Sequence, residues 1–414
     1  MVRIKKVSSI FAALCFFILP ATAQHKPVRG HVMIPKSSMA KPGDAGKFYH
    51  THLQIFVPDS GNPNMGPPFP GFGFETPASI ACLYGLAPHV RGCNPNVVAI
   101  NPSGGKGVIA IVDAFDDPNA AADLAFFSQQ FGLPNPKIQV VFANGTKPDV
   151  DPTGGWEAEE SLDIEWAHAM APKAKIILVE AASPSGDDLF GAEIVAANLV
   201  AAQGGGEVSN SWGGEEFDDE AQLDFIFQVP GVVFFASTGD APGTQYPSTS
   251  PDVVAAGGTT TARSPFSGDF LYELPWAEAG GGPSEFEPRP HYQNSIARVV
   301  GDTRGVPDMS FDSNPDTGVW VWDSNPLQGQ PSAGWLVVGG TSVASPSLAG
   351  IVNSSGRLVR SSEAELSVIY DNARNPFAFN DIRFGYCGPY AGFLAEPGWD
   401  FCTGVGSVNG KEGK

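Results

Sequence analysis

The stretch GVIAIVD, residues 107–113, is apolar up to its last residue, which is typical of a strand that is buried on both faces. Further apolar runs follow it, and segments of helical length separate them. The expected strands are KIQVVFA (137–143), AKIILVEA (174–181), EVSNSW (207–212) and GVVFFAST (231–238). Strands that alternate with helices indicate an α/β fold, a doubly wound and mostly parallel sheet with helices on both faces, whose sites form at the carboxyl ends of the strands.

The expected helices supply the other half of this pattern. They are DPNAAADLAFFSQQFG (117–132), WEAEESLDIEWAHAMAP (156–172), which Pro172 ends, and DDLFGAEIVAANLVAAQGG (187–205), which ends in glycine. A further helix is expected between the strands 207–212 and 231–238. The turn-rich region 261–330 is interpreted as surface loops and hairpins, and no internal repeat is evident.

The composition limits the classes of partner. The chain has 414 residues, of which 42% are hydrophobic and 16% charged, so a substantial core can form. The formal net charge of -20 at pH 7 argues against nucleic acid and against an anionic membrane as partners. An acidic surface fits a secreted protein that works in acid, and it fits plain solubility as well.

The N-terminus has the three parts of a secretory signal peptide. MVRIKK (1–6) supplies positive charge, SSIFAALCFFIL (8–19) the apolar core and ATAQ (21–24) a cleavage site after Ala23. The apolar run is too short to span a membrane, and no later run is long and apolar enough, so we expect a soluble, secreted protein. Residues 24–75 are then an N-terminal extension or short pro-segment with a strand-like run at THLQIFVP (51–58), and the main domain covers 76–414.

Four cysteines remain once the signal peptide, which contains Cys15, is removed. An even number of cysteines in an exported chain predicts two disulfides, and four cysteines allow three pairings. We favour the local pairing, Cys82 with Cys93 and Cys387 with Cys402, because it closes two short loops.

Two carboxylates lie one helical turn apart in the expected helix 156–172. Glu159 and Asp163 are four residues apart, so their Cβ atoms lie about 5–6 Å from each other on one helix face. A functional pair at that distance would share a proton, with at least one pKa raised, which suits a general base in mild acid. An acidic, solvated helix face is the alternative, and Glu157, Glu160 and Glu165 support it.

Two more side chains lie at junctions where reactive groups are common. In VVGGTSVASPSLAG (337–350), Ser342 opens a small-residue helix, where backbone N–H groups and the helix dipole stabilise negative charge. Ser342 is therefore a candidate nucleophile, although an N-cap is the commoner role of a serine at a helix start. Asp240 ends FFASTGD (234–240), where a carboxyl can cap a turn or stay protonated as a donor to a developing oxyanion.

Four stretches together resemble the sedolisins, also called serine-carboxyl peptidases. They are EESLD (159–163), STGD (237–240) with YPSTSPDVVAAGGT (246–259) after it, GGTSVASP (339–346), and NDI (380–382) with PGWDFCTGVGS (397–407). The resemblance covers roughly residues 76–410. It implies a subtilisin-like fold with a seven-stranded parallel sheet and the hydrolysis of peptide bonds in proteins or peptides. We expect the activity to peak at about pH 3–5.

The resemblance also implies a role for each candidate residue. Ser342 matches the nucleophile, and Glu159 matches the general base that takes its proton. Asp163 matches the partner that orients and polarises Glu159. Asp240 matches the oxyanion donor, which acts together with the backbone N–H of Ser342.

Two further matches each have a plain structural alternative. Asp113 takes the place where the family often has a glutamate linked to the base, and it is otherwise a turn residue at a strand end. Trp212, in SNSWGG (209–214), matches a residue beside the substrate cleft, and it is otherwise a core tryptophan.

The C-terminal loop 380–407 resembles the calcium loop of the family and implies one structural calcium ion (Ca²⁺), which takes carboxylate and carbonyl oxygens. Asp381 and Asp400 would give side chains, and Ile382, Glu396 and Gly398 would give backbone carbonyls. Glu396 stands where family members often carry glycine. A turn that is held by a disulfide, without a metal, is the alternative.

The segment before the main domain departs from the family pattern. Many sedolisins carry a long folded pro-domain, whereas here only residues 24–75 separate the signal peptide from the main domain. The segment therefore either stays attached as part of the mature fold or is trimmed. A monomer is the default expectation.

Three rival classes explain less of the sequence. A Ser-His-Asp protease needs a histidine near the serine, and His168, five residues past Asp163, faces away from the carboxylate pair. A two-carboxylate glycosidase uses Glu159 and Asp240 but leaves Ser342 unused. A catalytically inactive binding protein on a peptidase scaffold is disfavoured because every catalytic position holds a competent residue.

Overall fold

The computed structural model describes residues 29–59, 73–330, 334–388 and 392–414. The predicted signal peptide and its cleavage site after Ala23 lie outside these residues. No helix in the described ranges is long and apolar enough to cross a membrane.

Seven neighbouring parallel strands form the centre of the largest sheet among the described residues. In spatial order they are β5 (Lys137–Phe142), β6 (Lys175–Ala181), β4 (Val108–Ala114), β7 (Gly206–Asn210), β9 (Val232–Ser237), β11 (Val254–Arg263) and β15 (Met309–Asp312). β12 (Phe270–Pro275) pairs with β11, and the short β21 (Ser407–Val408) and β18 (Phe379–Asn380) continue the sheet past β15. The predicted doubly wound sheet with seven parallel strands is confirmed.

The strand order reverses beside β4. The chain places β5 and β6 on one side of β4 and then crosses to β7 on the other side. In open α/β sheets the connections separate at such a point and leave a crevice for ligands at the carboxyl ends of the strands. Asp113 in β4 and Ser211, directly after β7, therefore lie where the sheet topology predicts a site.

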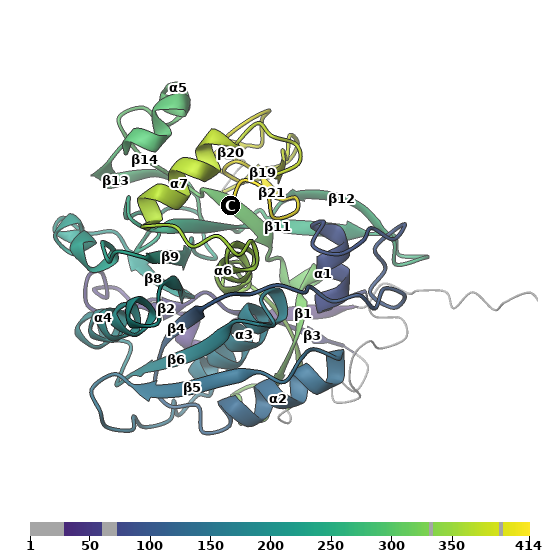
Figure 1. Ribbon diagram of the computed structural model, residues 1–414, viewed down its shortest axis with the longest axis horizontal. Coiled ribbons are helices and arrows are strands. Elements are labelled where there is room, and N and C mark those ends of the chain that lie inside the picture. Colours follow the sequence, from purple (N-terminus) through teal and green to yellow (C-terminus); the bar gives the residue numbers. More distant parts are fainter. Residues whose placement is uncertain (1–28, 60–72, 331–333, 389–391) are drawn as a thin grey trace, which may run out of the picture.

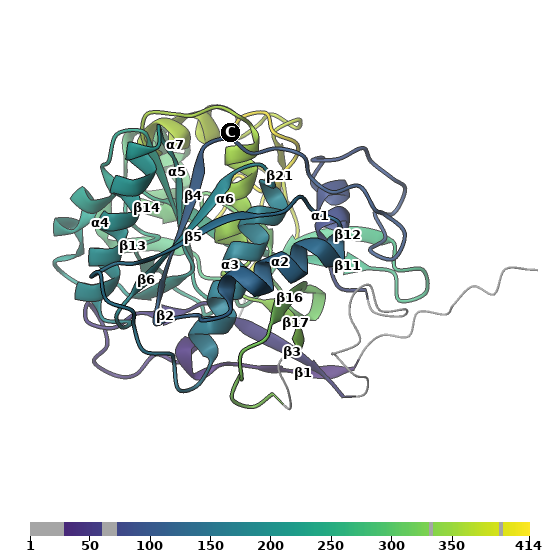
Figure 2. The same cartoon turned by 60° about the horizontal axis from the view of Figure 1, so that its bottom comes forward.

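Helices cover both faces of the sheet because successive side chains of a strand point to opposite sides. Ile109 and Ile111 of β4 belong to one hydrophobic cluster, with residues of α2 (Ala120–Phe131), α3 (Gly155–Met170) and α6 (Ala344–Ser354). The intervening β4 residues belong to a second cluster, with residues of α4 (Gly186–Ala202). Figure 2 shows α2, α3 and α6 on the same side of the sheet.

Helix α3 is buried along its whole length. It packs against α6, α2 and β16 (Val319–Asp323) as well as against the sheet. Its acidic residues are therefore not a solvated face: Glu157, Glu160 and Glu165 are each at most 2% exposed. The alternative interpretation of this helix, a charged surface, is wrong because packing covers both of its sides.

Two regions differ from the sequence prediction. Between β7 and β9 the chain forms β8 (Trp212–Glu215) and two short 3-10 turns, Glu220–Gln222 and Asp224–Phe227, in place of one helix. The region 261–330 contains the β11–β12 hairpin, as expected, but also β15 of the central sheet and the buried β16. Those two strands are short and lie between turn residues, so the sequence pattern of this region indicated loops and hairpins.

The N-terminal segment is part of two sheets. β1 (Gly30–Met33), β3 (Gln54–Pro58), β17 (Gly334–Gly339) and β16 form a four-stranded sheet, in that order. β2 (His50–Thr51) and β10 (Gln245–Tyr246) pair with the two sides of β8. Figure 2 shows β1 and β3 beside β16 and β17, at the bottom of the view. The predicted strand THLQIFVP is therefore divided between β2 and β3, at His52 and Leu53.

The remaining elements flank the central sheet (Figure 1). They are α1 (Pro77–Leu83), β13 (Gly282–Pro288), α5 (Ala297–Val300), β14 (Thr303–Val306), α7 (Ser362–Asp371), β19 (Tyr386–Cys387) and β20 (Phe393–Leu394), with 3-10 turns at Lys36–Ser38, His291–Ile296 and Pro315–Thr317. The disulfides Cys82–Cys93 and Cys387–Cys402 are both present, which confirms the local pairing.

Candidate active site

Three buried carboxyl groups lie together at the crevice beside β4 and β7. Glu159 and Asp163 come from α3, Asp113 comes from β4, and each is 0% exposed. None of them forms an ion pair with a described residue. Burial raises the pKa of all three well above the usual range, and the nearby charge of Asp163 raises the pKa of Glu159 and Asp113 further. The cluster therefore keeps protons at pH values where exposed carboxyls have lost them.

Ser342 lies between the end of β17 and the start of α6, as predicted. Its hydroxyl donates to the backbone carbonyl of Ser211 at 3.2 Å, and α6 has no side-chain cap, so Ser342 is not an N-cap in this structure. The hydroxyl also lies near Glu159, whose pKa it lowers against the larger effect of burial. Ser342 is thus a buried hydroxyl beside the predicted base.

Ser211 links Ser342 to the acidic cluster, and the sequence analysis did not single it out. The Ser211 hydroxyl donates to Oδ1 of Asp163 at 2.8 Å and lies 3.2 Å from the carbonyl oxygen of Ser342. Its backbone carbonyl accepts the hydrogen bond from the Ser342 hydroxyl. Its position near the end of the expected strand 207–212, in a sheet whose sites form at strand ends, is the sequence signal that could have found it.

Asp240 lies on the other side of Ser342, after β9. Its Oδ1 accepts hydrogen bonds from the N–H of Thr341 at 2.7 Å and from the Thr341 hydroxyl at 3.0 Å. Its Oδ2 is buried and has no partner among the described residues. Burial raises the pKa of Asp240 to about 8, although the bonds from Thr341 lower it, and Glu278 adds to the rise. Oδ2 can therefore carry a proton and donate it in acid.

The N-terminal segment enters this site, which the sequence did not indicate. The N–H of Ser342 donates to the carbonyl oxygen of His52 at 3.1 Å, and the N–H of His52 donates to the carbonyl of Ser211 at 3.1 Å. The imidazole Nδ1 of His52 is hydrogen-bonded to Ser237 Oγ and its Nε2 to Gln245 Oε1, both at 2.6 Å. Because both ring nitrogens are bound there, His52 is not a base for Ser342.

Trp212 and His168 occupy packed positions. Trp212 is 0% exposed and its Nε1 donates to the backbone carbonyl of Val112 at 2.8 Å, so its side chain belongs to the core. Its backbone, in β8, pairs with Thr51 of the N-terminal segment. His168 Nε2 lies 3.0 Å from the carbonyl oxygen of Pro134, away from the acidic pair, as the helix spacing predicted.

The predicted calcium ligands lie in one loop region. They are Asp381, Ile382, Glu396, Gly398 and Asp400. Asp381 Oδ1 accepts from the N–H of Gly398 at 3.0 Å, and Asp400 Oδ2 accepts from the N–H of Glu396 at 3.0 Å. Arg383 pairs with Asp381 Oδ2 at 2.8 Å. Carboxylates and carbonyls of this kind fit a hard cation by their chemistry, with Arg383 as a competing positive charge.

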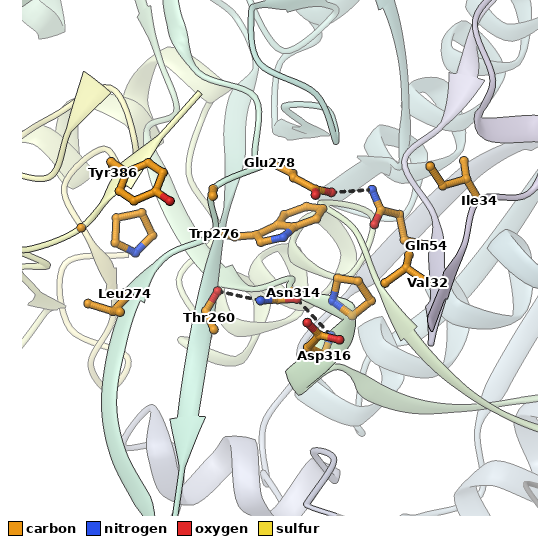
Figure 3. A pocket seen from close by; sticks show the side chains of 14 residues that line it. Val32, Ile34, Gln54, Thr260, Leu274, Trp276, Glu278, Asn314, Asp316 and Tyr386 are labelled. Carbon is orange, nitrogen blue, oxygen red and sulfur yellow. Dashed lines mark hydrogen bonds between the residues drawn. The ribbon is translucent and has the colours of Figure 1, made fainter. Parts of the chain in front are cut away.

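A surface cavity of about 450 Å³ borders the site (Figure 3). Its lining combines the N-terminal segment with the main domain and includes Val32, Ile34, Gln54, Trp276, Glu278 and Asn314. In Figure 3 Glu278 points toward Gln54, whose Nε2 donates to Glu278 Oε2 at 3.5 Å. The described lining contains none of the predicted catalytic residues, and Glu278, whose charge raises the pKa of Asp240, links the cavity to them.

Comparison with curated proteins finds two relatives, although no family model matches the chain. Kumamolisin from Bacillus sp. (strain MN-32) is 29% identical over 377 residues, and the match covers 81% of this chain and 62% of kumamolisin. Sedolisin from Pseudomonas sp. (strain 101) is 31% identical over 191 residues, and the match covers 41% of this chain and 30% of sedolisin. The chain therefore spans less than two thirds of the length of either relative.

Solved structures show the same fold. Pseudomonas sedolisin, a serine-carboxyl proteinase complexed with two molecules of pseudo-iodotyrostatin, has a TM-score of 0.65 at 24% identity, covering 81% of this chain and 95% of the other. The S41 psychrophilic protease has a TM-score of 0.52 at 18% identity, covering 81% of this chain and 98% of the other. The expected subtilisin-like α/β fold is confirmed.

Proposed function

We propose that this chain, which is homologous to kumamolisin and sedolisin, is a serine-carboxyl peptidase that hydrolyses peptide bonds of proteins or peptides in acid. One observation carries the proposal. The Ser342 hydroxyl lies between a buried carboxyl cluster without a cation and a second buried carboxyl, Asp240, whose pKa is raised to about 8. A serine in these surroundings can be activated by a carboxylate, and Asp240 can donate to a developing oxyanion.

Each of these residues has one role in the proposed reaction. Ser342 Oγ attacks the carbonyl carbon of the substrate while Glu159 takes the hydroxyl proton, which it later gives to the leaving nitrogen. Asp163 orients Glu159. Asp113 lies close enough for the carboxylates to repel one another, so the cluster carries no second negative charge in acid. The coupled carboxyls titrate in steps, so one shared charge is enough for the base. Protonated Asp240 and the N–H of Ser342 donate to the oxyanion.

The proposal requires activity at acid pH. As the pH rises toward 8, Asp240 loses the proton that it must donate, since its pKa is raised to about 8. The carboxyl cluster gains further charge over the same range, which opposes the charge that develops on the oxyanion. At very low pH the cluster becomes fully protonated and Glu159 can no longer accept a proton. The rate is therefore expected to pass through a maximum below the range in which Asp240 ionises, and the sequence predicts this maximum at about pH 3–5.

A pH profile of peptide hydrolysis by the purified protein tests this function. Ser342→Ala and Glu159→Gln are each expected to lower the rate at the optimum by at least about 10³-fold, since triad-type residues act as a unit. Glu165→Gln is the matched control, because Glu165 is a buried acid of the same helix whose Oε2 accepts from the N–H of Trp322 at 3.0 Å, a bond that an amide oxygen can keep. We expect its profile to match the wild type.

Each rival predicts a different outcome of this experiment. Peptide hydrolysis that survives Ser342→Ala would contradict the nucleophile, and glycoside hydrolysis that survives it would favour a two-carboxylate glycosidase. A folded protein without hydrolysis at any pH would favour an inactive peptidase scaffold that binds peptides. Activity at pH 8 with none at pH 4 would contradict the proposed base.

We also propose one structural calcium ion in the loop 380–407. Asp381 and Asp400 would hold it with side chains, and Ile382, Glu396 and Gly398 with carbonyl oxygens. Such an ion would supply positive charge that fixes the loop, and it would take no part in the reaction. The proposal is supported by the donor chemistry and by the two backbone hydrogen bonds, from Glu396 and Gly398, that gather this loop around the two carboxylates.

Export and a monomeric state remain proposals. Export is supported by the two disulfides, which form in oxidising compartments, and by the predicted signal peptide. The acidic net charge supports the expectation that neither nucleic acid nor an anionic membrane is a partner.

A further inference from the structure

Residues 48–52 of the N-terminal segment form an extended strand that crosses the serine, and β2 within it pairs antiparallel with β8. The carbonyl oxygen of His52 accepts from the N–H of Ser342 at 3.1 Å. Two residues further on, Gln54 of β3 pairs antiparallel with Gly339 of β17, the strand that leads to Ser342. An extended peptide is recognised through its backbone in this way. Gln54 therefore marks where such a peptide would place the second residue after a carbonyl that faces the serine.

The side chain of Gln54 lines the cavity of Figure 3, where it faces Glu278. Gln54 Nε2 donates to Glu278 Oε2 at 3.5 Å, which is longer than the usual distance of about 2.9–3.0 Å. The nitrogen of a lysine side chain lies one bond further from the backbone than the amide nitrogen of glutamine. A lysine at this place would therefore reach Glu278 more closely than Gln54 does, and its hydrogen bond would be charge-assisted.

The walls of the cavity are bonded to the chain next to the reactive groups. One wall is the loop between β12 and β13, where the N–H of Gly280 donates to the carbonyl of Gly239 at 2.8 Å. Gly239 is the residue before Asp240. Another wall is the turn after β15, where the N–H of Gly340 donates to the carbonyl of Ser313 at 2.6 Å. The cavity therefore keeps a fixed position relative to the serine and the proposed oxyanion donor.

The charge of the cavity is negative. Its described lining contains two exposed carboxylates, Glu278 and Asp316, and no lysine, arginine or histidine. Neither carboxylate forms an ion pair with a described residue. The lining also includes the buried indole of Trp276. An aliphatic stem can pack on such a ring while its charged end reaches a carboxylate, so a long cationic side chain matches both parts of the lining.

We propose that this cavity is a subsite for a lysine or arginine side chain at the second residue after the cleaved bond, and that Glu278 and Asp316 select its charge. This inference rests on the proposed function. A substrate that takes the path of residues 48–54 puts its second residue after the cleaved bond in the place of Gln54, with the cationic end against Glu278. An acidic residue at this place would face two carboxylates and be rejected, so attraction and repulsion both contribute to the selection.

The first test uses the full chain without a substrate. Gln54→Lys places a cation beside Glu278 and is expected to raise the Tm at about pH 6 by at least about 1 °C, whereas Gln54→Glu should lower it. In a Glu278→Gln background the Tm difference between these two variants should fall by at least about half. Glu285→Gln is the matched control, because Glu285 is an exposed acid of β13 outside the lining, and this background should keep the full difference.

The second test measures selection among substrates. Three free peptides differ only at the second residue after the cleaved bond, which is lysine, glutamine or glutamate, and mass spectrometry of the products identifies the bond that is cut. We expect kcat/KM for the lysine peptide to exceed that for the glutamate peptide at least about fivefold, with the glutamine peptide between them. Glu278→Lys should reverse this order, and Glu285→Lys should keep it. Each ratio is taken within one variant, so a change in rate that is common to all peptides cancels.

The outcomes separate the inference from the proposed function. Equal rates for the three peptides, or an order that Glu278→Lys leaves unchanged, would overturn the subsite and leave the peptidase standing. A Tm difference between Gln54→Lys and Gln54→Glu that is the same with and without Glu278 would overturn the pairing in the cavity. Hydrolysis of none of the peptides at any pH would contradict the peptidase and the substrate subsite together, and the Tm series would still decide whether the cavity holds a cation.

Discussion

Asp308 and Asp113 are both 0% exposed, yet their surroundings differ. Asp308 accepts two hydrogen bonds from the buried guanidinium of Arg304, at 2.8 and 2.6 Å, and one each from Tyr370 and the N–H of Ala255. Neither oxygen of Asp113 has a partner among the described residues, and its nearest charged neighbours are the acids Asp163 and Glu180. A buried carboxylate that is paired with a cation stays charged and contributes to the structure. Buried carboxyls without a cation stay protonated, and a reaction can use their protons.

The largest test of this comparison is the stability of the protein against pH. Burial raises the pKa of Glu193, Glu207 and Asp323 to about 8, from about 4 in an unfolded chain. A raised pKa stabilises the fold fully below about pH 4, and this contribution is lost as the pH rises through about 8. We expect the free energy of unfolding, measured by denaturant titration, to fall from pH 4 to pH 8 by several kcal/mol, on the order of 5 or more.

Buried basic groups act in the opposite direction. Burial lowers the pKa of His52 to about 4 and of Lys414 to about 7, and it also lowers the pKa of His168 and Lys411. These shifts favour higher pH, but the buried acids outnumber them. Glu193→Gln keeps an oxygen for the Asn210 amide, which lies 3.2 Å from Glu193 Oε1, and should flatten the slope. Stability that is equal or greater at pH 8 would contradict the idea that the unpaired acids are protonated.

The paired aspartate gives the second test. Arg304→Met leaves Asp308 buried without its cation and is expected to lower the free energy of unfolding by about 3–5 kcal/mol. Asp113→Asn, which replaces a protonated acid by an amide, should change stability at pH 4 by less than about 1 kcal/mol. Calorimetry of both variants beside Arg298→Met, an exposed arginine, measures the contrast. Equal losses for Arg304→Met and Asp113→Asn would remove the distinction between the two regions.

Asp240 gives the third test, because its Oδ2 has no partner among the described residues and is proposed to donate a proton to the oxyanion. Asp240→Ala is expected to lower kcat by about 10²–10³-fold, or about 2.7–4 kcal/mol in the barrier, as for the loss of one oxyanion donor. Asp240→Asn keeps a donor that does not ionise, so it should retain more activity and lose the decline near pH 8. Steady-state kinetics from pH 3 to 9 measure this, with exposed Asp218→Ala as the control. If the rate of Asp240→Asn still falls near pH 8, a group other than Asp240 causes this fall.

The smallest expected effect is that of calcium. Chelation of an ion held at a hundredfold excess over its Kd removes about 2.7 kcal/mol of stability. We expect EGTA to lower the Tm of wild type and to leave the Tm of Asp381→Asn unchanged, while the control Asp371→Asn, an exposed acid of α7, responds like wild type. If EGTA lowers none of these Tm values, Arg383 alone balances the charge of Asp381 and the loop needs no metal.

The parts of the fold that local pattern controls were predictable. β4, β6 and β9 are continuous apolar runs, and α2, α3 and α4 fall between turn residues, so the alternation indicated the parallel sheet. β15 was missed because four residues among turns do not form a recognisable run, and its strand pairing depends on β11, a distant segment.

The candidate site was predictable only where side chains carry the chemistry. Ser342, Glu159, Asp163 and Asp240 are recognisable as residue types, and the structure brings them to one crevice. Burial of α3 on both sides was not predictable, because it depends on β16, α2 and α6, so the solvated alternative stayed open. The contribution of His52 was hidden for a different reason. Its N–H and carbonyl make the decisive contacts, and every residue has those groups.

The strand of residues 48–52 and the serine that it covers belong to one chain, which fixes how strongly they compete with other peptides. A tethered ligand acts at an effective concentration on the order of millimolar, and dilution of the protein does not change it. An external peptide at micromolar concentration is therefore outcompeted as long as the strand of residues 48–52 stays in place. Competition by this strand is therefore equally strong in a dilute and in a concentrated solution of the protein.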